Sequence, residues 1–244
     1  MNRIKSFNIK IKQLAILIDP DKCSEDHLLF LTTKVNQSDK NCFCFFVGGS
    51  LISQNRCDEI VTYIKQNTNC SVYIFPGTST CLTPKADAFL LLSLVSGRNA
   101  EWLIGKHVAV APKLKQSGLK IMSTAYLLID SGRPTTVHYI SNTQPIPADK
   151  PEIAATTALA SEMLGMKLIY LEAGSGAEKC VSKEMIIAVK QSVEIPLIVG
   201  GGIDSKEKAK NALDAGADMI VIGNAFERNK DFLIEIIKLF EKYN

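Results

Sequence analysis

One glutamate stands at the end of an apolar run and directly before a glycine-rich loop. Residues 167–171 have the composition of a buried strand, and Glu172 is followed by Ala173, Gly174, Ser175 and Gly176. A carboxylate at such a strand end suits a general base, and glycine leaves room for a phosphate to approach main-chain N–H groups. A solvated acid in an ordinary loop is the alternative interpretation.

Two further glycine loops follow apolar runs near the end of the sequence. Residues 196–199 lead into Gly200, Gly201 and Gly202, and residues 219–222 lead into Gly223 and Asn224, with a helical segment at 205–215 between them. Paired glycine loops of this kind are typical of the phosphate site after strands 7 and 8 of a (β/α)8 barrel.

Oxygen ligands for a hard cation follow the first two expected strands. Asp19 and Asp21 flank Pro20 after the aliphatic run 14–18, and Ser50 closes the run 42–47. Carboxylate and hydroxyl oxygens suit Mg²⁺, which is often shared with substrate phosphates. An Asx turn around the proline would explain both aspartates without a metal, and Ser50 would then only end a strand.

The elements that would position these residues alternate along the chain. Strands are expected at 14–18, 42–47, 72–75, 87–92, 119–129, 167–171, 196–199 and 219–222; helices are expected at 24–35, 54–66, 97–110, 150–164, 182–191, 205–215 and 226–243. The helix after the third strand is nearly missing. Alternation over eight units predicts one (β/α)8 TIM barrel spanning residues 1–244, and an open doubly wound sheet is the alternative.

Two segments lie outside this pattern. Residues 1–13 form an N-terminal segment, and the polar stretch 130–147 is expected to be an insertion with 136–140 as one arm of a hairpin.

Composition limits the classes of partner and location. The net charge is +3 with scattered lysines, so nucleic acid is a poor candidate. No apolar run reaches the roughly 20 residues of a membrane span, and the N-terminus lacks an apolar signal region, which predicts a cytoplasmic protein. The seven cysteines contain no Cys-x-x-Cys pair, so buried reduced thiols are expected rather than disulfides or metal ligands.

Together, these motifs resemble the geranylgeranylglyceryl phosphate synthase family from about residue 14 to 240. The stretch Tyr170-Leu171-Glu172-Ala173-Gly174-Ser175-Gly176-Ala177 is the specific part; 199–203 and 222–224 are shared with many phosphate-binding barrels. The resemblance implies Mg²⁺-dependent transfer of a geranylgeranyl or other polyprenyl group from its diphosphate to the C3 hydroxyl of sn-glycerol 1-phosphate.

The resemblance also implies roles for individual residues. Asp19 and Ser50 would hold Mg²⁺, and Glu172 would lie beside the acceptor hydroxyl as the base. The glycerol phosphate would bind Tyr170, Leu171, Glu172, Ala173, Gly174, Ser175, Gly176, Gly201, Gly202, Gly223 and Asn224. In that family the third helix is replaced by a strand-like segment, which would open a groove for the prenyl chain, lined from the region 75–94.

Some features separate this chain from part of that family. Leu17 stands where the smaller bacterial relatives have lysine, and the 130–147 segment is similar to the larger second group, whose members form homo-oligomers. Trp102 would either limit prenyl length or lie at a subunit interface. A sugar-phosphate isomerase or lyase on the same barrel is the competing enzyme class, and a non-enzymatic phosphate-binding barrel is the third hypothesis.

Overall fold

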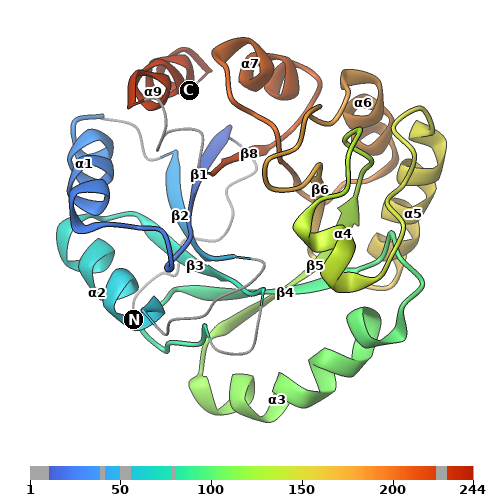
Figure 1. Cartoon of the computed structure of the whole chain (residues 1–244), viewed down its shortest axis with the longest axis horizontal. Helices are drawn as coiled ribbons and strands as arrows, with labels where there is room; N and C mark the ends of the chain where they lie inside the picture. Colours follow the sequence, from blue (N-terminus) through green and yellow to red (C-terminus); the bar gives the residue numbers. More distant parts are fainter. Residues whose placement is uncertain (1–10, 39–41, 50–55, 78–80, 224–229, 244) are drawn as a thin grey trace.

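Eight parallel strands close into a barrel in which the spatial order follows the chain order (Figure 1). The computed structural model describes residues 11–38, 42–49, 56–77, 81–223 and 230–243. The strands are β1 Gln13–Ile18, β2 Phe43–Gly48, β3 Ser71–Phe75, β4 Ala88–Leu94, β5 Lys120–Leu128, β6 Leu168–Glu172, β7 Leu197–Gly200 and β8 Met219–Ile222. The closed pairing of β1 with β8 confirms the predicted (β/α)8 barrel and rules out the open sheet.

Helices surround the barrel as an outer layer (Figure 1). They are α1 Glu25–Asn36, α2 Cys57–Asn67, α3 Lys106–Ser117, α4 Thr136–Ser141, α5 Pro151–Met163, α6 Lys183–Ser192, α7 Lys206–Asp214 and α9 Lys230–Tyr243, with a π-helical turn at Glu101–Gly105 before α3. Ser24, Ser182 and Ser205 cap α1, α6 and α7, because the side-chain oxygen of each accepts a main-chain N–H of the first helical turn.

The outer layer is thin between β3 and β4. The described parts of that connection, residues 76–77 and 81–87, contain turns and bends but neither helix nor strand. The expected loss of the third helix is confirmed, whereas the expected strand-like replacement is not seen in these described residues. On this side of the barrel, β4 lies beside the π-helical turn and α3.

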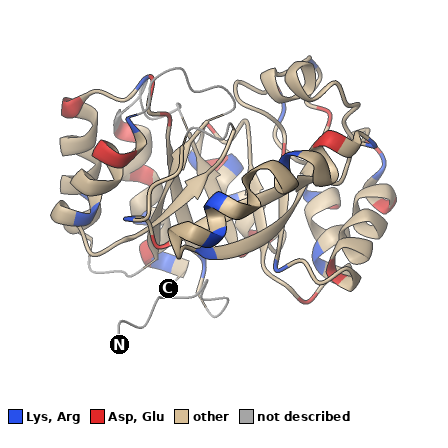
Figure 2. Cartoon of the chain, turned by 90° about the horizontal axis from the view of Figure 1, so that it is seen from below, with Lys and Arg blue, Asp and Glu red and all other residues tan. Residues whose placement is uncertain are grey.

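Alternate residues of each strand face opposite sides of the barrel wall, so the strands contribute to two apolar layers. Outside the strands, aliphatic side chains pack against the helices. Inside, the layer is rich in aromatic residues: Phe46, Tyr73, Phe75, Tyr126 and Tyr170, with Ala15, Cys44, Ala88, Leu90, Leu94, Met122, Leu128, Leu168, Ile198, Met219 and Val221. In Figure 2 the coloured charged residues lie mainly on the surrounding helices and connections.

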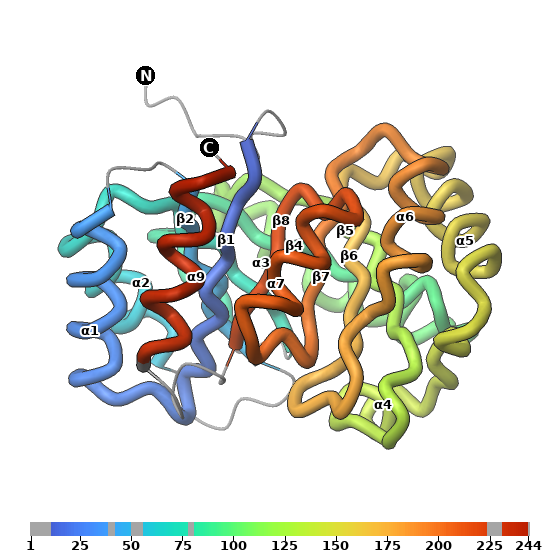
Figure 3. Tube along the Cα trace, turned by 90° about the horizontal axis from the view of Figure 1, so that it is seen from above, coloured from blue at the N-terminus to red at the C-terminus, as the bar shows by residue number. Residues whose placement is uncertain are grey.

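The expected hairpin arm at 136–140 is wrong, since these residues lie in the short helix α4. Thr135 precedes it in an extended conformation and Asn142 ends it in the left-handed region, with φ 48°. A strand needs a neighbour to pair with, so β-branched composition alone is a weak guide. Figure 3 shows α4 at the end of the barrel opposite to the start of β1, over the carboxyl ends of the strands.

The expectation of reduced thiols throughout is also wrong, because Cys57 and Cys81 form a disulfide. Cys57 begins α2 and Cys81 follows β3, and the barrel brings these segments together across a sequence separation of 24. Spacing in the sequence contains no sign of this proximity.

Among the helices that the structure describes, none combines the length and apolarity needed to cross a bilayer.

Candidate active site

Two cavities of different chemistry meet at the carboxyl ends of the strands. A polar cavity of about 820 Å³ reaches the ends of β1, β2, β6, β7 and β8. An apolar cavity of about 380 Å³ lies between β4 and α3. Phe75, Tyr126 and Val137 line both of them. A ligand with a charged head and an apolar tail could therefore occupy the two cavities at once.

Glu172 lies in the polar cavity as the last residue of β6 and is only 7% exposed. The Gly174 N–H donates to its Oε1 over 2.6 Å. Burial raises the pKa of Glu172, and the neighbouring Tyr170 and Gly174 N–H offset part of that rise. The solvated-loop interpretation is therefore wrong, because this carboxylate is buried and holds a proton more tightly than an exposed one.

Tyr170 lies fully buried beside Glu172. Within the described part of the chain, its hydroxyl makes no hydrogen bond of standard geometry. Burial, followed by the charge of Glu172, raises the pKa of this phenol, so it stays protonated at neutral pH. A buried O–H beside a carboxylate is suited to bind a hydroxyl-bearing ligand.

Gly200 and Gly201 make space for these side chains. A Cβ built on Gly200 would overlap the Tyr170 hydroxyl and lie 3.0 Å from Oε2 of Glu172. A Cβ on Gly201, whose φ is +82°, would lie 2.7 Å from the Ala173 N and overlap Oε1 of Glu172. The first two glycines of this triplet are thus needed to make room for Glu172 and Tyr170, whether or not a phosphate binds there.

Most predicted substrate-binding residues come together in the polar cavity. Those that line it are Tyr170, Glu172, Gly174, Ser175, Gly176, Gly201, Gly202 and Gly223. Leu171 and Ala173 instead pack in the layer between the strands and helices. Ser50 and Asn224 lie outside the described residues.

Asp19 follows β1 and lines the same cavity. Its Oδ1 accepts the Asp21 N–H at 3.1 Å, and Lys22 Nζ lies 2.9 Å from its Oδ2. The Asx turn is therefore present, and the Asp19 carboxylate that forms it also lines the cavity. The turn and a role as a metal ligand are thus compatible. A single carboxylate that meets substrate phosphate oxygens fits the usual Mg²⁺ shell. The described residues contain no cluster of three or more His, Cys, Asp or Glu side chains suited to a metal.

Sequence reasoning missed several side chains of the cavity. Lys22 follows the recognised aspartates, and Arg133, Thr136 and Val137 come from the segment treated as a bare insertion. The pair Arg133-Pro134 in a polar stretch was the available signal. Tyr126 was also missed; its ring packs edge-on against Tyr170 with centroids 5.2 Å apart.

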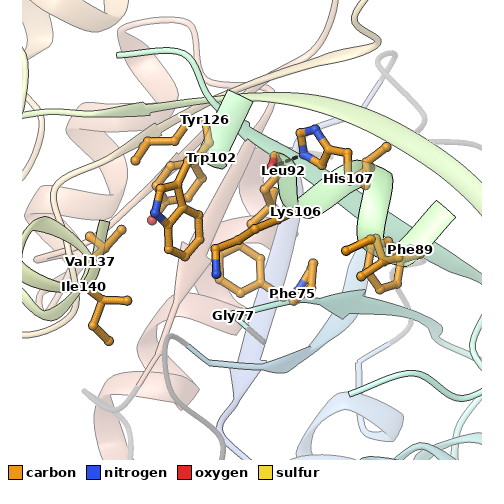
Figure 4. A pocket seen from close by; sticks show the side chains of 15 residues that line it. Phe75, Gly77, Phe89, Leu92, Trp102, Lys106, His107, Tyr126, Val137 and Ile140 are labelled. Carbon is orange, nitrogen blue, oxygen red and sulfur yellow. Dashed lines mark hydrogen bonds between the residues drawn. The ribbon is translucent and has the colours of Figure 1, made fainter. Parts of the chain in front are cut away.

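The apolar cavity is lined by residues of the region 75–94, as expected for a groove beside β4. Figure 4 shows Trp102, Phe75 and Tyr126 around it, with Val137 and Ile140 of α4 on one side. Lys106 Nζ lies 4.5 Å from the centre of the Trp102 ring. His107 Nε2 lies 2.8 Å from the Leu92 carbonyl oxygen.

Residues 8–240 match the sequence model of the PcrB family. The chain belongs to the PcrB family. It is 50% identical over 233 residues to the geranylgeranylglyceryl phosphate synthase of Spirosoma linguale, covering 96% of this chain and 93% of that one. The protein of the same name from Korarchaeum cryptofilum is 37% identical over 228 residues, covering 93% of each.

A solved structure of the same kind is similar to this PcrB-family chain along its whole length. It is the (S)-3-O-geranylgeranylglyceryl phosphate synthase of Thermoplasma acidophilum in complex with the substrate sn-glycerol-1-phosphate. The TM-score is 0.88 at 33% identity, covering 99% of both chains. The resemblance inferred from the motifs is therefore confirmed at the level of family and fold.

Proposed function

We propose that this PcrB-family protein transfers a polyprenyl group from its diphosphate to the C3 hydroxyl of sn-glycerol 1-phosphate. The observation that carries the proposal is the junction of the two cavities at Phe75, Tyr126 and Val137, with Glu172 in the polar one. The names of the relatives support it, and they favour it over the sugar-phosphate isomerase alternative and the non-enzymatic barrel.

In this proposal, the acceptor occupies the polar cavity. Its phosphate lies among the glycine loops after β6, β7 and β8, where N–H groups and absent side chains permit close contact. Its C3 hydroxyl lies beside Glu172, and the Tyr170 hydroxyl donates a hydrogen bond to an oxygen of glycerol 1-phosphate. The buried carboxylate then accepts the hydroxyl proton as the ether bond forms.

The donor spans the junction. Its prenyl chain lies in the apolar cavity and its diphosphate reaches the polar one, on the side of Asp19. The bond between C1 of the allylic chain and the diphosphate oxygen breaks, and its electron pair leaves with pyrophosphate. The glycerol oxygen bonds to C1 and loses its proton to Glu172. The aromatic rings of Phe75 and Tyr126 lie where an allylic cation would form, which suits cation–π stabilisation.

Asp19 and Ser50 would hold Mg²⁺ in this proposal. When bound, Mg²⁺ supplies Lewis-acid stabilisation of the diphosphate charge. Asp19 is oriented for such a role by the Asp21 N–H. Lys22, paired with the same carboxylate, adds a positive charge on this side of the cavity.

Trp102 bounds the apolar cavity, which favours a role in setting prenyl length over a role at an interface. A geranylgeranyl chain is our first expectation, in keeping with the names of the relatives. We also propose a cytoplasmic location and a homo-oligomer. Met163 and Leu164, 77% and 80% exposed at the end of α5, are apolar groups that assembly would cover.

Product analysis tests the function directly. The protein is incubated with Mg²⁺, sn-glycerol 1-phosphate and prenyl diphosphates of increasing length, and an ether-linked phosphate product is expected with one length preferred. Omission of Mg²⁺ tests the cation, and sn-glycerol 3-phosphate tests the stereochemistry of the acceptor. Absence of product with every donor would contradict the proposal.

A further inference from the structure

Arg133 is a charged residue of the polar cavity to which no role has been assigned above. It lies in the connection between β5 and α4, and its Nη2 donates to the carbonyl of Gly176 in the loop after β6. Within the described ranges it forms no ion pair, whereas Lys22, the other cation lining the cavity, is paired with Asp19.

The main chain before Arg133 is held in place by a set of hydrogen bonds. The Gly132 N–H donates to Oδ1 of Asp130 at 3.0 Å, and the Ser131 hydroxyl donates to the Arg133 carbonyl at 3.3 Å. The Lys179 N–H donates to the Ser131 carbonyl at 3.2 Å, which ties the connection to the segment after the β6 loop. The guanidinium therefore starts from a fixed backbone position beside that loop.

Neighbouring carboxylates leave this guanidinium available. Asp204 pairs with Lys208 at 2.8 Å, and Glu172 accepts the Gly174 N–H. Glu178 also lines the cavity, and no hydrogen bond or ion pair among the described residues joins it to Arg133. A guanidinium has five N–H donors, and the bond to the Gly176 carbonyl uses one N–H of Nη2. The remaining donors can bind an anion in the cavity.

We propose that Arg133 binds the phosphate group of glycerol 1-phosphate, an inference that rests on the proposed function. Its contact at Gly176 places it on the side of the β6 and β7 loops, where Gly174–Gly176, Gly201 and Gly202 line the cavity. Asp19 and Lys22 mark the other side, where the diphosphate binds. Arginine pairs with phosphate through two parallel N–H donors and adds a positive charge that main-chain N–H groups lack.

The 130–147 segment borders both cavities. The same segment supplies Val137 to both cavities and Ile140 to the apolar one. It therefore acts as a common wall that contacts the acceptor through Arg133 and the donor chain through α4. The segment is part of the binding site rather than a peripheral insertion.

The test compares Arg133→Met and Arg133→Lys with the matched control Arg98→Met. Arg98 also donates to main-chain carbonyls, at 2.9 Å to Val95, but lines neither cavity. For Arg133→Met, the KM for glycerol 1-phosphate should rise roughly 10- to 100-fold, the range for loss of a charge-assisted contact. The KM for prenyl diphosphate should change by less than about twofold, the scale of minor effects. Arg133→Lys should recover part of the loss, and Arg98→Met should match the wild type.

Calorimetric titration with sn-glycerol 1-phosphate alone separates this inference from the proposed function, because it needs no turnover. Weaker binding by Arg133→Met, partly restored in Arg133→Lys, supports the inference. Unchanged binding, or a selective rise in the KM for prenyl diphosphate, overturns it. Absence of turnover in the wild type overturns the proposed function instead. If Arg133→Met does not fold, the comparison of Arg133→Lys with the wild type decides the question.

Discussion

The Gly174 N–H donates to Oε1 of Glu172 over 2.6 Å, so the loop that follows β6 orients the carboxylate that ends it. Gly201 of the next loop leaves the space in which that same oxygen lies. Residues of two glycine loops thus surround one carboxylate, so the candidate base and the candidate phosphate-binding loops are packed together.

Replacement of Glu172 by Gln should lower kcat by roughly 100-fold or more, the usual contribution of a positioned base. Gln keeps an oxygen to accept the Gly174 N–H, so the loop should stay in place and the KM for glycerol 1-phosphate should change little. Steady-state kinetics measures both values. Full activity in this variant would show that another group accepts the proton.

The same substitution should stabilise the fold at neutral pH. Burial raises the pKa of Glu172 above its ordinary value of 4.5, so the folded protein holds this proton more tightly than the unfolded chain. In the wild type, the stability that comes from protonated Glu172 is fully present below the pKa of the unfolded chain. It is lost as the pH rises through the pKa of the folded protein. Melting temperatures are measured for both proteins from about pH 4, near the ordinary carboxyl pKa, to about pH 8. As the pH rises, the melting temperature of the wild type should fall relative to that of Glu172→Gln. Parallel curves would contradict the raised pKa.

Replacement of Asp19 by Asn should increase the Mg²⁺ concentration needed for half-maximal activity by roughly tenfold or more, an energy change of about 1.4 kcal/mol. The variant also removes the partner of Lys22, 2.9 Å away. Lys22→Met is therefore the control, because it removes the ion pair and leaves the carboxylate. An unchanged metal requirement in Asp19→Asn would place the metal elsewhere.

Replacement of Trp102 by Ala should shift the preferred donor toward longer prenyl chains, since the ring bounds the apolar cavity. Competition between prenyl diphosphates of different length, followed by product analysis, measures the shift. Lys106→Met is the control, because Lys106 lies 4.5 Å from the ring centre and its loss keeps the indole. An unchanged length preference would favour an interface role for Trp102.

Loss of the Cys57–Cys81 disulfide should lower the free energy of unfolding. For the separation of 24 residues, the loop-closure argument gives about 3.5 kcal/mol. Denaturant unfolding of Cys57→Ser/Cys81→Ser is compared with Cys180→Ser, which removes a free thiol. Equal stability of the three proteins under oxidising conditions would mean that the two thiols remain reduced.

The sequence by itself determined the barrel and most of the site. Aliphatic runs ending in Asp19, Glu172, Gly200 and Gly223 predict strands, and parallel strands in a closed barrel bring their carboxyl ends to one face. The order of these motifs was enough to predict that Asp19 and Glu172 share a cavity. That information is local and periodic, which is why one sequence suffices to find it.

Tertiary structure alone decided the features that depend on contacts between distant segments. The Cys57–Cys81 disulfide and the contact of Arg133 with Gly176 each join segments whose spacing follows no periodic rule. The raised pKa of Glu172 belongs with them, because it comes from burial by the whole barrel end. Strand positions follow from side-chain periodicity along the chain, whereas these features follow from packing across it.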